Sequence, residues 1–255
     1  MPGDERPPPE RDGLSGIAPG ERDRALALLR AGRMRLLGLI EGASNGTFLA
    51  EVADGHGSAL AVYKPRRAEA PLWDFPDGTL YRREVAAFEL ADALGWPHVP
   101  PTAVVDGSLG VGSAQLFVEH DPEEHFFALA GTRLDDFAEV ALFDAIANNA
   151  DRKAGHCLHG PDGNVWLVDH GVCFAEEPKL RTVIWDFAGD PLPEALRERV
   201  AAAAASLDGG EAADRLSALL APGEVRAAAD RAARLAATGC FPLPGSSRSV
   251  PWPPV

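Results

Sequence analysis

The sequence lacks the features that would place it in a membrane or in an oxidising compartment. Its 255 residues include only three cysteines, and this odd, sparse set favours free thiols over a disulfide framework. No apolar run reaches the roughly 18 residues that a membrane-spanning helix needs. The N-terminus has no apolar segment of the kind found in secretory signals. We therefore expect a soluble, cytoplasmic protein.

Positive charge is also scarce. The chain has 24 Lys and Arg residues against 38 Asp and Glu residues, which gives a formal net charge of −14. Such a surface repels phosphate backbones and anionic bilayers, so we expect no nucleic-acid partner and no integral membrane association. Hydrophobic residues make up 46% of the sequence, an ordinary balance for a globular protein.

Composition divides the chain into four parts. Residues 1–20 are rich in proline and charge and predict a disordered leader, and residues 241–255 predict an extended, Pro-rich tail. Between them the pattern changes near residue 120. Residues 21–119 read as strands around one helix, and residues 120–240 are mostly helical.

The expected elements define an α+β fold with two lobes. In the first lobe we expect strands over 33–40, 46–53, 58–64, 102–105 and 114–119, with a helix over 79–94 and a turn at Asp106-Gly107. In the second lobe we expect helices over 134–149, 193–207 and 210–238, and a strand-loop-strand over 157–171.

A turn rich in small residues joins the first two expected strands. Ser44, Asn45 and Gly46 form its tip, where backbone N–H groups can approach phosphate oxygens. A plain β-turn is the alternative. Lys64 ends the third expected strand, and Glu84 follows in the next helix. A lysine on strand three that pairs with a helix glutamate is the arrangement that holds ATP phosphates in kinases.

Two further loops carry aspartates. Asp151 follows the helix over 134–149 and could orient or deprotonate a hydroxyl group, while Arg152 and Lys153 could neutralise phosphoryl charge. The alternative is a helix C-cap at Asn149 or Gly155. Asp169 follows a β-run and precedes Gly171, which suits a Mg²⁺ ligand between phosphates or a simple turn.

The two aspartate loops resemble those of one kinase branch. Asp151-Arg152-Lys153 is similar to the Asp-Arg-His of the catalytic loop in phosphatidylinositol 3- and 4-kinases, above all the type II 4-kinases, and in HipA-like kinases. Residues 168–174 resemble the Asp-x-Gly metal-binding segment of that branch. The similarity covers about residues 40–190, and a small actinobacterial group of phosphatidylinositol-kinase-like proteins matches best.

The resemblance implies a two-lobed protein-kinase-like fold and assigns roles. Lys64 would contact the α- and β-phosphates of ATP, and Glu84 would hold it. Asp151 would be the catalytic aspartate and Asp169 the main ligand of Mg²⁺ or Mn²⁺. The hinge between the lobes would bind adenine through the segment that contains Gln115, Phe117 and Val118.

His156 departs from the family pattern, which has asparagine there as a second metal ligand. An imidazole prefers softer ions such as Mn²⁺ over Mg²⁺. The resemblance thus implies an ATP-dependent phosphotransferase acting on a hydroxyl of a lipid, a protein Ser/Thr or a small alcohol. The alternative is a pseudokinase, a nucleotide-binding regulatory module without turnover that acts through a protein partner.

Two other interpretations stay open at this stage. The first is a metal site within one hairpin, for which the candidate ligands are His156, Cys157, His159, His170 and Cys173. The second is an apolar, membrane-touching loop that contains Leu72, Trp73 and Phe75.

Overall fold

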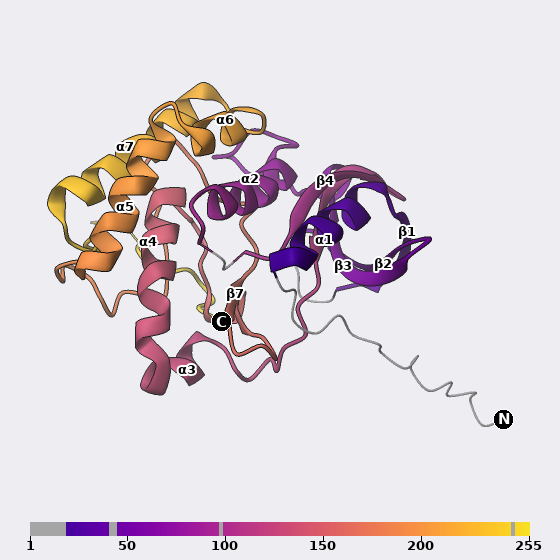
Figure 1. Cartoon of the computed structure of the whole chain (residues 1–255), viewed down its shortest axis with the longest axis horizontal. Coiled ribbons are helices and arrows are strands. Elements are labelled where there is room, and N and C mark those ends of the chain that lie inside the picture. The colour runs from indigo at the N-terminus through magenta and orange to yellow at the C-terminus, as the bar shows by residue number, and fades with distance from the viewer. Residues whose placement is uncertain (1–18, 41–44, 97–98, 246–247) are drawn as a thin grey trace.

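The computed structural model describes residues 19–40, 45–96, 99–245 and 248–255, with side chains from residue 21 onward. Figure 1 shows a sheet-containing lobe formed by the first part of the chain and a helical lobe formed by the second. The α+β, two-lobed fold predicted from the sequence is therefore confirmed. The exact boundaries at residues 119, 120 and 240 stay a prediction.

The first lobe contains a five-stranded antiparallel sheet. Its strands are β1 (Arg33–Leu39), β2 (Phe48–Asp54), β3 (Gly57–Pro65), β4 (Thr102–Gly107) and β5 (Gly110–Leu116), in the spatial order β1-β2-β3-β5-β4. Side chains alternate along β3, so Ala61 and Tyr63 are buried on one face while Val62 and Lys64 project from the other. The period of two thus directs Lys64 away from the core of the sheet.

The helix α1 covers the buried face of this sheet and was not expected from the sequence. α1 (Pro19–Ala31) places Ala25, Leu28 and Leu29 at helical spacing, and all three enter one apolar cluster with β2 and β3. Pro19 and Gly20 belong to this helix, and the remaining residues of the predicted leader lie outside the described ranges.

The helix α2 (Leu80–Ala93) packs with the second lobe. Five of its buried residues belong to the same apolar core as the helices of that lobe: Ala86, Ala87, Phe88, Leu90 and Ala91. Arg83 is 1% exposed, pairs with Glu224 and donates to the carbonyl oxygen of Cys173 at 2.7 Å. These contacts fix α2 against the helical lobe.

The second lobe consists of short helices and one hairpin. Its elements are α3 (Phe126–Arg133), a 3₁₀ turn (Leu134–Phe137), α4 (Ala138–Ala147), a 3₁₀ turn (Ala154–His156), β6 (Cys157–His159), β7 (Val165–Leu167), α5 (Glu194–Leu207), α6 (Glu211–Ser217) and α7 (Pro222–Thr238). Within the described ranges, no helix combines the length and apolarity needed to cross a bilayer.

Several predicted boundaries were wrong. The strand over 114–119 ends at Leu116, and the hairpin before it turns at residues 108–109, because Asp106 still pairs with Val111 in the ladder. The helix over 134–149 starts as a 3₁₀ turn and ends where Asn148 adopts φ 53°. The helix over 210–238 is two helices, since Pro222 cannot continue α6 and instead begins α7.

We expect α1 to be an integral part of the first lobe. Leu29 is 2% exposed, so Leu29→Ala should lower the free energy of unfolding by about 2–5 kcal/mol, measured by urea denaturation. Leu37 on β1 is 43% exposed, and Leu37→Ala should change stability by less than about 1 kcal/mol. Equal losses in the two variants would show that α1 does not form part of this core.

Candidate functional site

A cleft of about 620 Å³ lies between the two lobes. Ten residues proposed from the sequence line it: Asn45, Gly46, Lys64, Glu84, Gln115, Phe117, Val118, Asp151, His156 and Asp169. Arg152 and Lys153 are not among the lining residues, and Ser44 lies outside the described ranges. The fold therefore brings together segments that are more than 100 residues apart in the sequence.

The centre of the cleft is an ion cluster around Lys64. Its ammonium group bonds the Oε1 atom of Glu84 and lies 2.8 Å from the Oδ1 atom of Asp169. Glu84 is almost completely buried, and its other oxygen accepts the backbone N–H of His170 at 2.9 Å. One glutamate of α2 thus holds both the lysine of β3 and the backbone next to Asp169.

Burial and mutual attraction set the protonation of this cluster. Burial favours neutral Lys64, but the carboxylates of Asp169 and Glu84 outweigh it and raise the Lys64 pKa. The Lys64 charge is the main cause that lowers the pKa of Asp169, against burial. For Glu84 the larger effect is burial, which raises its pKa, while Lys64 opposes that shift. The site therefore holds a charged lysine beside an ionised aspartate.

The backbone at Asp169 is held in an unusual conformation. Asp169 has φ 61°, in the left-handed region that Asn, Asp and His adopt more often than other residues with a side chain. The bond from His170 N–H to Glu84 lies directly after it. The side chain of Asp169 is 50% exposed and lines the cleft.

Asp151 faces the same cleft from the loop after α4. Its N–H donates to the Oδ1 atom of Asn149 at 3.0 Å, and Lys153 Nζ lies 3.6 Å from its Oδ2 atom. Burial raises the pKa of Asp151, with Lys153 acting in the opposite direction. The left-handed residue that ends α4 is Asn148, so the alternative of a cap at Asn149 or Gly155 does not describe this loop.

Arg152 does not face the cleft, which corrects the expectation that it meets phosphoryl charge. It is 0% exposed, and its guanidinium forms a bidentate ion pair with Asp144 of α4, with N···O distances of 2.9 Å. It also donates to the carbonyl oxygen of Val168 at 2.9 Å and meets the Nε2 atom of His170 at 2.9 Å. Arg152 therefore connects the loop that carries Asp151 with the loop that carries Asp169, on the side away from the cleft.

His156 lies beside Asp169 in the cleft. Its Nε2 atom is 3.4 Å from the Oδ2 atom of Asp169, and burial lowers its pKa to about 4. A neutral imidazole can ligate a metal ion. Together with the exposed carboxylate of Asp169 it offers two donors on one side of the cleft, which fits a cation that takes its other ligands from phosphate and water.

The hairpin metal site considered from the sequence is not formed. Among the described residues, no group of three or more His, Cys, Asp or Glu side chains could hold a metal ion by itself. His159 instead bonds Glu124 and Arg133, each at 2.6 Å, and His170 is buried against Arg152. Cys157 is buried in the apolar core.

The turn that contains Asn45 and Gly46 already forms hydrogen bonds within the protein. The N–H of Gly46 donates to Ala68 at 3.2 Å, and the Oδ1 atom of Asn45 accepts from Ala70 at 2.7 Å. A Cβ atom at Gly46 would lie 2.7 Å from the Cβ of Ala68, so this contact requires glycine. Both residues line the cleft, but these two groups are used within the protein.

Some hydrogen-bonding groups of the hinge segment are already bonded within the protein. Gln115 is buried and its amide donates to Thr102 at 2.9 Å, while the N–H of Phe117 donates to Leu60 at 3.0 Å. The carbonyl oxygen of Val118 lies 2.9 Å from the Nδ1 atom of His120. Apolar residues from both lobes also line the cleft; they are Ile40, Val62, Leu116, Phe117, Leu158 and Val168.

The residues of the apolar loop proposed for membrane contact differ in exposure. Trp73 is 93% exposed and lies under the ammonium of Lys179 at 5.1 Å, whereas Phe75 is buried beneath Arg83. Both residues and Leu72 line the mouth of the cleft.

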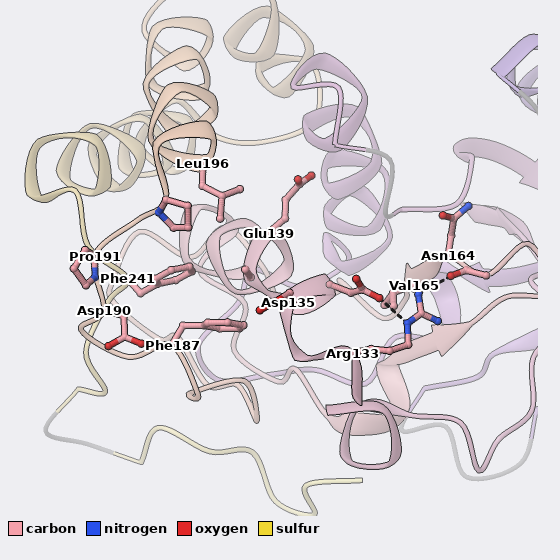
Figure 2. Close-up of a pocket in the computed structure, with 14 residues that line it drawn as sticks. Arg133, Asp135, Glu139, Asn164, Val165, Phe187, Asp190, Pro191, Leu196 and Phe241 are labelled. Carbon is pink, nitrogen blue, oxygen red and sulfur yellow. Dashed lines mark hydrogen bonds and ion pairs between the residues drawn. The ribbon is translucent and has the colours of Figure 1, made fainter. Parts of the chain in front are cut away.

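A second cavity, of about 700 Å³, lies in the helical lobe and shares no lining residue with the cleft. Figure 2 shows the rings of Phe187 and Phe241 at one side of it, with Asp135 and Arg133 farther along. The larger cavity thus holds none of the residues proposed from the sequence, and the site is assigned to the cleft by its chemistry.

The sheet, α2 and the helical lobe around this cleft define a protein-kinase-like fold. Among solved structures, the Golgi casein kinase with Mn/ADP bound shares this fold with a TM-score of 0.62; the alignment covers 87% of this chain and 76% of that one at 14% identity. No protein-family model matches the chain.

The chain belongs to the family of Rv2133c, a protein of Mycobacterium tuberculosis. The two are 39% identical over an alignment of 274 positions, which covers 94% of this chain and 98% of Rv2133c. The chain is also similar to phosphatidylinositol 4-kinase gamma 4 of Oryza sativa, at 34% identity over 178 residues that cover 56% of this chain and 31% of the plant protein. The resemblance to phosphatidylinositol 4-kinases is thus confirmed as a distant one.

The buried Asp144–Arg152 pair should dominate the stability of the loops around the cleft. Asp144→Ala leaves the Arg152 cation buried without its counter-ion, which we expect to cost about 3–5 kcal/mol in urea denaturation. Asp136→Ala breaks the more exposed pair with Arg133 and should cost less than about 1 kcal/mol. Similar losses for both variants would contradict the assigned role of Arg152.

Proposed function

We propose that the protein is an ATP-dependent phosphotransferase that transfers the γ-phosphoryl group to a hydroxyl acceptor. The observation that carries this proposal is the Lys64 cluster, in which one ammonium bonds both a helix glutamate and the exposed Asp169 at the centre of the interlobe cleft. This geometry suits a cation that receives phosphate oxygens beside a metal-ligating carboxylate.

In this proposal the cleft binds ATP with adenine at the hinge. The base would contact apolar residues that line the cleft, such as Val62 and Val168, and would bond the backbone of the hinge. Lys64 contacts the α- and β-phosphates. Asp169 and His156 would hold Mg²⁺ or Mn²⁺, which neutralises charge on the phosphates. The Golgi casein kinase, whose fold this chain shares, carries Mn/ADP and thereby supports the choice of ligand.

Asp151 is the proposed catalytic residue. It lies in the cleft and its pKa is raised by burial, which suits a group that accepts a proton from an attacking hydroxyl. Lys153, whose ammonium lies 3.6 Å from Asp151, would offset charge at the reacting end. Arg152 positions the loop and makes no contact with the substrate in this scheme. The acceptor is a lipid, a protein Ser/Thr or a small alcohol.

His156 motivates a second candidate function. An imidazole replaces the asparagine of the family pattern at the metal side of the cleft, and its Nε2 atom lies 3.4 Å from Asp169. A site that binds ATP through the Lys64 cluster but holds the metal differently would act as a nucleotide-responsive regulatory module and bind a protein partner.

The purified protein should turn over ATP in the presence of Mg²⁺ or Mn²⁺. Asp169→Asn should lower turnover by roughly 100-fold or more, because it removes the anionic metal ligand. Asp151→Asn should lower turnover while leaving ATP binding, measured by thermal stabilisation, close to wild type. Asp23→Asn on the exposed face of α1 is the matched control and should leave both quantities unchanged.

The outcomes separate the two candidates. Thermal stabilisation by ATP without any product would contradict the phosphotransferase and favour the regulatory module. No stabilisation by ATP with either metal would contradict both.

A further inference from the structure

The C-terminal segment, residues 248–255, does not extend freely from the helical lobe. Pro251 is buried, and the carbonyl oxygen of Ser249 accepts from the N–H of Thr182 at 3.0 Å and from the indole N–H of Trp185 at 3.0 Å. Residues 248–255 of the predicted Pro-rich tail are therefore held against the helical lobe.

The segment reaches the loop that carries the proposed catalytic residue. The carbonyl oxygen of Pro254 accepts the N–H of Ala154 at 2.8 Å. Ala154 is 0% exposed and lies three residues after Asp151 and two before His156. A buried N–H without a partner costs about 1–3 kcal/mol, so this loop needs an acceptor at that position.

A second neighbour supports the loop from its other side. Arg152 N–H donates to Arg181 O at 3.0 Å, and Val183 N–H donates to Arg152 O at 3.1 Å. Thr182, between these two residues, is the one whose N–H bonds Ser249. The C-terminal segment thus contacts both the loop and the strand-like residues that pair with the loop.

We propose that the C-terminal segment positions the loop over residues 151–156 for phosphoryl transfer, through the Pro254 carbonyl on Ala154. This inference rests on the proposed function. It assigns a site role to a segment whose residues do not line the cleft. The contact acts on Asp151 and His156 through the backbone and makes Pro254 a positioning residue.

The contact should affect chemistry more than nucleotide binding. Lys64 lies on β3, Glu84 lies on α2, and the hinge residues lie in or just after β5, so none of them belongs to the loop over 151–156. A small displacement of a reacting group can cost about 100-fold in rate. Loss of the segment should therefore lower kcat and leave the KM for ATP within about twofold.

The test is a chain that lacks residues 252–255. This truncation keeps the buried Pro251 and the Ser249 contacts but removes the Pro254 carbonyl. We expect kcat to fall roughly 10- to 100-fold and amide hydrogen exchange over residues 151–157 to speed up, while thermal stabilisation by ATP persists. Val255→Ser, at a 56% exposed side chain, keeps the backbone contact and is the matched control.

Each result decides the inference. Unchanged kcat, or unchanged exchange over residues 151–157, would overturn it, as would an equal effect of Val255→Ser. If the intact protein has no turnover, the proposed function fails by itself. The exchange measurement then still decides whether the C-terminal segment orders the loop.

Discussion

The site depends on one desolvated cation between two carboxylates. Lys64 ends a strand, Glu84 lies on a helix that packs with the other lobe, and Asp169 follows the β6–β7 hairpin, yet the three meet at the centre of the cleft. Burial opposes charge on Lys64 and Glu84, but the carboxylates of Asp169 and Glu84 together raise the pKa of the lysine. The lobes are therefore joined where a nucleotide would bind.

A second buried charge organises the loops behind this cluster. Arg152 is completely buried and bonds Asp144, two backbone carbonyl oxygens and His170. A planar guanidinium with five donors can satisfy several acceptors at fixed angles, which an ammonium group cannot. This geometry holds the loops that carry Asp151 and Asp169 to each other.

The sequence predicts the residues that share the cleft but not every role. Lys64 could be paired with Glu84 because a lysine that ends strand three and a glutamate in the next helix form the arrangement that holds ATP phosphates in kinases. The burial of Arg152 was not predicted, since its partner is Asp144; a charged residue in the otherwise apolar run of α4 was the signal for it. The docked C-terminal segment acts through carbonyl oxygens, which every residue has, so composition cannot reveal it.

The attachment of α2 to the helical lobe has a consequence for how the two lobes are joined. Its apolar face belongs to the core of that lobe, and Arg83 bonds Glu224 and the carbonyl of Cys173 across the same boundary. The sheet and α1 form a separate core of their own. The apolar cores therefore do not coincide with the two sides of the cleft: Glu84 lies on a helix that shares the core of the helical lobe, Lys64 lies on a strand of the sheet, and their ion pair links the two.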